Sequence, residues 1–329
     1  MRGVTIRQLQ IFAAAAAHLS FVRTSEQLHL TQAAVSLQIK RLEEMAGFAL
    51  FERRGRKVAL TEAGDVLLRY AQQVLAALRD ADLALSALKG LTGGRIRVGV
   101  VSTAKYFAPA LLARFQQRHP GVRVALSVNN REIIVRELER DEIDIAIMGQ
   151  PPPRLATDAT AFADHPLVVI AAPGHPLTGV RRVPLAALAG ETFLVREQGS
   201  GTRSSMERFF AERGFEPRIG TVMSSNETIK QAVMAGMGLA FISRHTIGLE
   251  LSAGRLAELD VVGLPLMRRW YVVQRAGRFV SPAAAAFVDF VVAAAPVLLA
   301  EMHPPRVAKP APRSRIANRT TAGSRSRSR

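Results

Sequence analysis

The feature that most constrains this chain is a close succession of helix signals near its N-terminus. Apolar residues recur at helical spacing from Thr5 to Ala17. Ser20 can cap a second helix, and Thr31 can cap a third that runs from Gln32 to about Met45. Because about three residues separate the second and third helices, the pattern predicts a helix-turn-helix. The buried stripe of its last helix would consist of Val35, Ile39 and Leu42.

A basic turn follows these helices. Residues 50–60 read as two short extended pieces on either side of Gly55, which predicts a wing. Arg53, Arg56 and Lys57 lie in this segment, where their charges can contact phosphates or enter the minor groove. A basic turn can also be merely solvated, but here it adjoins the helix-turn-helix. We therefore expect residues 1–60 to form a winged helix-turn-helix DNA-binding domain.

A long helix is predicted next, over residues 61–90. Its apolar residues alternate steps of four and three, which is the spacing of a heptad repeat and favours dimerisation. The glycines between Gly90 and Gly94 end the helix. The residues of the expected heptad stripe are Leu67, Ala71, Val74, Leu78, Ala81, Leu85 and Leu88.

Beyond Gly94 the pattern changes to short β-branched strands that alternate with helices, which is typical of a mostly parallel α/β sheet. The strands are expected at 96–101, 122–128, 143–148, 167–171 and 239–243. A crossover begins at Pro151, and Trp270 to Gln274 returns to the first sheet. We therefore expect a two-lobed α/β effector domain like a periplasmic binding protein over residues 91–302, with lobe I at about 91–163 and 267–302 and lobe II at about 164–266.

The distribution of charge and the absence of cysteine exclude several classes of protein. The net charge is +17, of which residues 1–60 contribute +5 and residues 303–329 contribute +8. A clustered basic surface of this kind is typical of a nucleic-acid partner. The tail 303–329 holds too few large apolar residues to fold, so we expect it to be disordered. Without a cysteine or a signal peptide, we expect a cytoplasmic protein with no thiolate chemistry and no membrane partner.

Three runs of residues closely resemble the DNA-binding signature of LysR-type transcriptional regulators. They are Thr31 to Glu43, Leu50 to Arg53 and Leu60 to Gly64. The resemblance implies double-stranded DNA with an inverted repeat as partner, a tetramer built as a dimer of dimers, and contact with RNA polymerase. The resemblance extends over essentially the whole chain except the tail 303–329.

A narrower resemblance lies in the α/β domain. The segments 101–107, 145–149, 199–203 and 225–233 resemble the Calvin-cycle branch of this family, which activates the RuBisCO operon. This resemblance implies a regulator that mainly activates carbon-fixation genes in response to a small metabolite. A LysR-type regulator of an unrelated metabolic operon stays open as the alternative.

The predicted DNA-reading residues lie on the third helix and the wing. Amide and hydroxyl side chains such as Gln32, Ser36 and Gln38 can reach base edges from the first turns of a recognition helix. Family members commonly carry proline at the position of Ala33 and arginine at that of Leu37, so another member's operator does not transfer to this chain. The complete predicted set is Thr31, Gln32, Ala33, Ser36, Leu37, Gln38, Lys40, Arg53 and Arg56.

The predicted effector site gathers residues that follow strands or begin helices. Free N–H groups at helix N-termini, hydroxyls and cations together favour an anion, such as a phosphorylated metabolite or NADPH. The alternative interpretation is that each hydroxyl only caps its own helix. The predicted set is Ser102, Thr103, Lys105, Arg131, Gly201, Thr202, Arg203 and Asn226.

Other classes of protein fit the sequence less well. The seven histidines are scattered without metal-ligand spacing, and no catalytic set or dinucleotide fingerprint emerges, so we expect no enzyme, no metal and no cofactor. A solute-binding protein would share the two lobes but not the DNA-binding module. A nonspecific architectural DNA-binding protein would bind without sequence preference and ignore small molecules.

Overall fold

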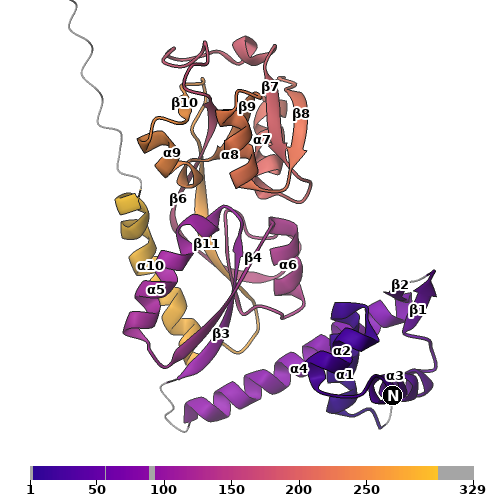
Figure 1. Ribbon diagram of the computed structural model, residues 1–329. Coiled ribbons are helices and arrows are strands. Elements are labelled where there is room, and N and C mark those ends of the chain that lie inside the picture. The colour runs from indigo at the N-terminus through magenta and orange to yellow at the C-terminus, as the bar shows by residue number, and fades with distance from the viewer. Residues whose placement is uncertain (1–2, 56, 89–92, 303–329) are drawn as a thin grey trace, which may run out of the picture.

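The chain begins with a helical unit, continues through one long helix and ends in a two-lobed α/β unit (Figure 1). The computed structural model describes residues 3–55, 57–88 and 93–302. Arg56, which we expected to contact DNA, and the basic tail 303–329 lie outside the described residues.

The three N-terminal helices begin where the sequence predicts their caps. They are α1 (Ile6–His18), α2 (Phe21–Leu28) and α3 (Gln32–Ala46). The hydroxyls of Thr5, Ser20 and Thr31 accept hydrogen bonds from backbone N–H groups three residues ahead, at 3.2, 3.4 and 3.1 Å. These caps satisfy N–H groups that have no partner inside the helix. The predicted helix-turn-helix is thus confirmed, and its buried stripe consists of Val35, Ile39 and Leu42.

Strands β1 (Phe51–Arg54) and β2 (Lys57–Leu60) form the predicted wing, an antiparallel hairpin. The carboxylate of Glu43, near the end of α3, accepts hydrogen bonds from the backbone N–H groups of Leu50 and Phe51, at 2.8 and 3.3 Å. The ring of Phe51 packs edge-on against the rings of Phe12 and Phe21, with centroids 5.6 and 5.3 Å apart. These contacts fix the wing relative to the recognition helix α3.

Helix α4 (Glu62–Leu88) is the predicted long helix, but its apolar residues serve two purposes. Leu67 and Ala71 are buried in the core of the N-terminal unit, so the prediction that they belong to a dimer stripe was wrong. The first turns of α4 pack against α1 and complete that core. The later positions Val74, Leu78 and Leu85 are 45, 39 and 58% exposed, which leaves an apolar stripe on the second part of the helix.

The α/β unit is built on one sheet with the strand order β4-β3-β5-β11-β6-β9-β7-β8, and β10 pairs with β6. Strands β6 and β11 run antiparallel to all their neighbours, while the other neighbouring pairs are parallel. The prediction of a mostly parallel sheet was therefore wrong at its centre, because two long strands connect the lobes in opposite directions. The strands are β3 (Gly94–Val101), β4 (Val122–Asn129), β5 (Ile145–Met148), β6 (Thr157–Ala171), β7 (Thr192–Arg196), β8 (Arg218–Met223), β9 (Leu239–Ser243), β10 (Ala257–Leu259) and β11 (Leu266–Arg275).

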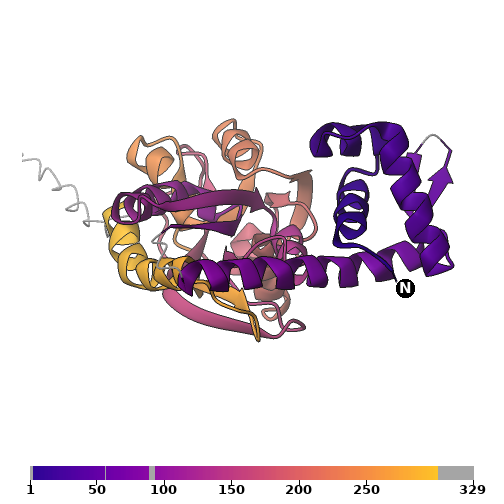
Figure 2. The same ribbon diagram turned by 90° about the horizontal axis from the view of Figure 1, so that it is seen from below.

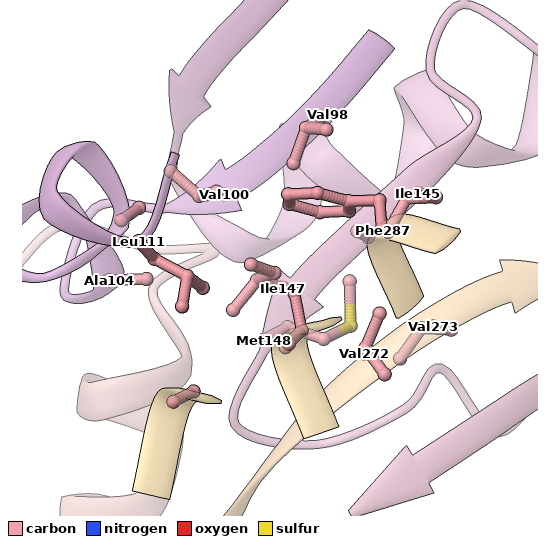
Figure 3. Packing of buried hydrophobic residues seen from close by; sticks show 14 of the residues in the cluster. Val98, Val100, Ala104, Leu111, Ile145, Ile147, Met148, Val272, Val273 and Phe287 are labelled. Atoms are coloured by element: carbon pink, nitrogen blue, oxygen red, sulfur yellow. The ribbon is translucent and has the colours of Figure 1, made fainter. Parts of the chain in front are cut away.

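Helices cover both faces of this sheet and enclose separate cores. The core of lobe I lies between β3, β5 and β11 and the helices beside them; Figure 3 shows Leu111 and Phe287 packed near Ile147. In lobe II, one core contains Phe193 and another contains Ile229. The helices are α5 (Ala108–Arg118), α6 (Arg131–Glu139), α7 (Gly201–Ala211), α8 (Asn226–Met234), α9 (Gly248–Ser252) and α10 (Pro282–Met302), with short 3-10 helices at Ala104–Tyr106, Leu185–Leu188 and Arg244–Thr246.

Helix α10 is long and apolar enough to cross a membrane by length and composition alone. In the structure it lies against lobe I beside α5 (Figure 1). Ser281 caps its first turn by accepting a hydrogen bond from the N–H of Ala284 at 3.2 Å. Phe287, Val291 and Leu298 on its inner face are buried in the lobe I core. Its apolar character therefore serves core packing.

A charged contact joins α4 to lobe I, and we call it the linker-helix contact. The guanidinium of Arg278 binds Asp80 of α4 and Asp141 of lobe I, each at 2.6 Å. Arg275 also binds the Asp141 carboxylate, at 2.7 Å, and Arg79 of α4 donates a hydrogen bond to the Asp141 carbonyl at 3.0 Å. Figure 2 shows α4 running along the underside of the α/β unit. The two units thus meet through hydrogen bonds and ion pairs.

Candidate DNA-binding surface and effector cleft

Two of the predicted DNA-reading residues of α3 line a hollow that also includes the wing. Gln32 and Ser36 of α3 and Arg53 of β1 line this hollow together. Ser20 and Arg23, at the start of α2, line it as well, and we did not predict them. They could have been foreseen, because the first helix of a helix-turn-helix presents its N-terminus to the DNA backbone.

Four polar side chains on this surface are free to bind a partner. Within the described residues, the side chains of Gln32, Gln38, Lys40 and Arg53 make no hydrogen bond or ion pair. Ala33 and Leu37 are exposed beside them, and Leu37 is 48% exposed. Thr31 is also exposed, although its hydroxyl oxygen caps α3. The surface therefore presents unsatisfied donors and acceptors around the recognition helix.

A candidate effector cleft lies where the two lobes meet. Five predicted residues line it, and they come from both lobes: Ser102, Thr103, Arg131, Gly201 and Thr202. Ser200 is the N-cap of α7, but its side chain makes no capping hydrogen bond, so the first N–H groups of this helix keep their capacity to donate. The hydroxyls of Thr103 and Thr202 likewise make no hydrogen bond to any described residue. These groups form an anion-binding arrangement at a helix N-terminus.

Two arginines add positive charge to this cleft. Arg131 donates hydrogen bonds to the carbonyls of Gln150 and Pro151, at 3.4 and 3.3 Å, and burial lowers its pKa. Arg268, which the sequence analysis missed, donates to the Gly149 carbonyl at 2.7 Å. Burial, assisted by neighbouring arginines, lowers the pKa of Arg268 to about 10, so it stays charged at neutral pH. The cleft therefore favours a negatively charged ligand.

The other three predicted effector residues do not line the cleft, and their side chains are bound to other residues of the chain. Arg203 pairs with Glu207 at 2.7 Å and donates to the Arg196 carbonyl at 3.0 Å. Lys105 lies 3.6 Å from the Glu227 carboxylate. Asn226, 1% exposed, accepts a hydrogen bond from the buried guanidinium of Arg196 at 2.6 Å. The structure thus gives these side chains positioning contacts in place of a ligand-facing orientation.

Arg196 connects the lobes across the cleft. Its guanidinium donates to both carboxylate oxygens of Glu197, at 2.8 and 3.0 Å, and to the hydroxyl of Ser102 in lobe I at 3.1 Å. The amide of Asn226 adds a 3.4 Å hydrogen bond to the Ser102 carbonyl. We call Arg196, Glu197, Asn226 and Ser102 the interlobe cluster. It positions the loop that carries Thr103.

His165 is a further cleft residue that the sequence analysis missed. It lies on β6, is 2% exposed, and stacks on Trp270 with ring centroids 3.8 Å apart. The register of β6 and β11 places it directly opposite Arg268. A histidine and an arginine inside apolar strands were the available signals, but only the strand register brings them together.

The free volume of the cleft is about 20 Å³, which holds roughly one water molecule. A ligand larger than a water molecule therefore requires the cleft to widen. Among the residues that the structure describes, no group of three or more His, Asp or Glu side chains is arranged to hold a metal ion.

Comparison with known families agrees with this architecture. Residues 6–65 match the family described as bacterial regulatory helix-turn-helix protein, lysR family, and residues 89–296 match the LysR substrate binding domain. The chain belongs to the LysR family of transcriptional regulators. This confirms the resemblance seen in the recognition helix and the wing.

Individual relatives narrow the comparison. This LysR regulator is 50% identical over 300 residues to the RuBisCO operon transcriptional regulator of Allochromatium vinosum, covering 91% of this chain and 98% of that one. It is 52% identical over 290 residues to the HTH-type transcriptional regulator CbbR of Rhodospirillum rubrum, covering 88% and 96%. The regulatory domain of Synechocystis PCC6803 CcmR in complex with 2-PG matches with a TM-score of 0.59 and 41% identity, over 61% of this chain and 96% of that chain.

Proposed function

We propose that this LysR regulator controls carbon-fixation genes, including those of RuBisCO, and mainly activates them in response to a small anionic metabolite. Its similarity to RuBisCO operon regulators over about nine-tenths of the chain supports the target genes. The observation that carries the ligand class is the uncapped N-terminus of α7, which lies beside Arg131 and Arg268 in the cleft. It would act in the cytoplasm, where its DNA lies.

The effector is a phosphorylated metabolite or NADPH, and the cleft favours the smaller of these. The hydroxyls of Thr103 and Thr202 and the first N–H groups of α7 supply donors for one oxyanion group. The relative that was solved with 2-PG supports a ligand of this size. Since the free volume holds about one water, ligand binding must open the lobes, and this movement is the signal.

On DNA, two recognition helices of one dimer would read half-sites of an inverted repeat about one helical turn apart. The exposed stripe of α4, with Val74, Leu78 and Leu85, is the surface that we assign to that dimer. A dimer of dimers would engage two such regions and bend the DNA between them. The ligand shifts the balance between tetramer arrangements and so changes contact with RNA polymerase.

The ligand class is tested by calorimetry with the full chain. Phosphorylated sugars, 2-PG and NADPH are titrated separately, with their unphosphorylated counterparts as controls. Binding of one phosphorylated compound and not of its control supports the proposal. Absence of heat with every anion contradicts it.

The target genes are tested by mapping the DNA fragments that the purified protein occupies in the genome of its source. Sites upstream of carbon-fixation genes support the proposal. Well-defined sites upstream of other genes would contradict the carbon-fixation target and assign the regulator to another operon. Occupancy spread evenly over the genome would favour an architectural DNA-binding protein.

A further inference from the structure

The ring of His165 has one nitrogen bonded and one without a partner. Nε2 lies 3.1 Å from the hydroxyl oxygen of Ser243, which is completely buried. Nδ1 is buried and has no hydrogen-bond partner in the described part of the chain. A buried polar atom without a partner costs about 1–3 kcal/mol, so its presence at a ligand cleft calls for an explanation.

The unpartnered nitrogen is directed towards the cleft. A Cβ placed on Gly149 would lie 2.7 Å from Nδ1 of His165 and 3.1 Å from the guanidinium of Arg268. Both nitrogens therefore border the small space above Gly149, and all three residues line the cleft. Any other residue at position 149 would cover Nδ1.

The bond to Ser243 decides which nitrogen carries the proton. The Ser243 hydroxyl has His165 as its one side-chain partner among the described residues. If Nε2 donated to this oxygen, both the serine proton and Nδ1 would lack partners. If the serine donates to Nε2, one group is left, the N–H of Nδ1. Because each unsatisfied buried group is costly, the second arrangement is favoured.

We propose that His165 reads the effector through a protonated Nδ1, which donates a hydrogen bond to an oxyanion bound above Gly149. This inference rests on the proposed function and specifies it, because the phosphate or carboxylate group would lie between His165, Arg268 and the N-terminus of α7. Stacking on Trp270 fixes the plane of the ring, so the donor direction is set before the ligand binds.

The ring remains neutral while it does so. Burial, followed by the charges of Arg268 and the ring of His245, lowers the pKa of His165 well below its ordinary value. The Nδ1 proton therefore belongs to a neutral tautomer. A neutral donor of this kind binds an anion without requiring a second buried charge beside Arg268.

A matched pair of variants tests the assignment. In His165→Asn the amide nitrogen takes the place of Nδ1, and in His165→Gln it takes the place of Nε2, while both variants lose the stacked ring. Affinity for 2-PG and for inorganic phosphate is measured by calorimetry on the full chain. We expect H165N to bind within a few-fold of the native chain and H165Q to bind about tenfold more weakly or worse. Equal losses in the two variants would overturn the assignment.

Nitrogen-15 NMR of the native chain, labelled at histidine, gives a readout that needs no ligand. The His165 signals are assigned by their disappearance in H165N, and the shift of Nδ1 shows whether it bears a proton. A protonated Nδ1 is expected, and an unprotonated one contradicts the inference. If Nδ1 bears the proton but no anion binds the native chain, the proposed anionic effector is wrong. The assignment of the proton to Nδ1 then stands.

Discussion

Within the part of the chain that the structure describes, the DNA-binding surface leaves polar side chains without partners, whereas the arginines at the effector cleft are held by the chain itself. Gln32, Gln38 and Arg53 on the DNA-binding surface have no partners within the described residues. In the cleft, Arg196 and Arg268 each bind several groups of the chain itself. A surface that meets a large, preformed polyanion can leave its side chains exposed. A small cleft must hold its charged groups in place, because they are buried before the ligand arrives.

The largest effect should come from the interlobe cluster. Replacing Arg196 by methionine removes the partner of Glu197 and Asn226, so we expect the α/β unit to lose on the order of 3 kcal/mol of stability. Chemical denaturation followed by tryptophan fluorescence measures this, since Trp270 is the one tryptophan and lies in this unit. Arg208→Met, which breaks an exposed i,i+4 pair with Glu212, is the control and should cost under about 1 kcal/mol. Similar losses of unfolding free energy in the two variants would show that the interlobe cluster contributes no more stability than a surface ion pair.

The reverse behaviour is expected on the DNA-binding surface. Gln32→Ala should leave stability unchanged but reduce operator affinity about tenfold, because a side chain that reads a base contributes roughly 1–3 kcal/mol. Arg53→Ala should weaken operator and unrelated DNA alike and reduce the salt dependence by about one ion. Gel-shift titrations at several salt concentrations separate the two. If Gln32→Ala weakens both DNAs equally, Gln32 does not read bases.

The cleft should also respond to pH through His165. Its pKa is lowered in the folded state, so the unfolded chain takes up a proton more readily. The contribution of the neutral His165 ring to the free energy of unfolding is therefore fully present above the ordinary histidine pKa of 6.5. It is lost as the pH falls below that value, by up to about 1.4 kcal/mol per pH unit. Denaturation midpoints between pH 7 and 5 measure the slope, and H165N should reduce it. An unchanged slope in H165N would assign the effect to another group.

The smallest effect should come from the cap of the recognition helix. Thr31→Ala removes the hydroxyl that accepts from the N–H of Ala34, at a cost of about 1 kcal/mol to the N-terminal unit. Hydrogen exchange of the first α3 amides reports this loss, and Thr31→Ser is the matched control that keeps the hydroxyl. Faster exchange in both variants would show that the methyl group, and not the cap, holds the helix end.

The contrast between the regions also explains what the sequence could predict. The helix-turn-helix depends on local signals such as the caps Ser20 and Thr31, and each lies within a few residues of its partner. His165 and Arg268 are brought opposite each other by the pairing of β6 with β11. Sequence periodicity specifies that a strand exists but not its register with a strand about a hundred residues away.

Arg203 and Leu67 also show that the sequence does not specify which residues meet in the folded chain. A cation near a helix N-terminus suggested a ligand contact, but a glutamate one turn later and a nearby carbonyl satisfy Arg203. A heptad position suggested a dimer contact, but α1 folds back onto α4 and buries Leu67 within its own chain. In both cases the residue type indicated an interaction, and tertiary structure decided the partner.

Strand β11 connects two sites, although its pairing with β6 shifts register between Trp270 and Tyr271. The strand carries Arg268 in the effector cleft and, seven residues later, Arg275, which binds Asp141 in the linker-helix contact. At about 3.3 Å per residue this arm is about 23 Å long, so a tilt of roughly 5° at the cleft displaces its far end by about 2 Å. Ion pairs at 2.6 and 2.7 Å do not survive such a displacement unchanged. A change of angle between the lobes would therefore be expected to alter, through β11 and Arg275, how α4 and with it the recognition helix are held.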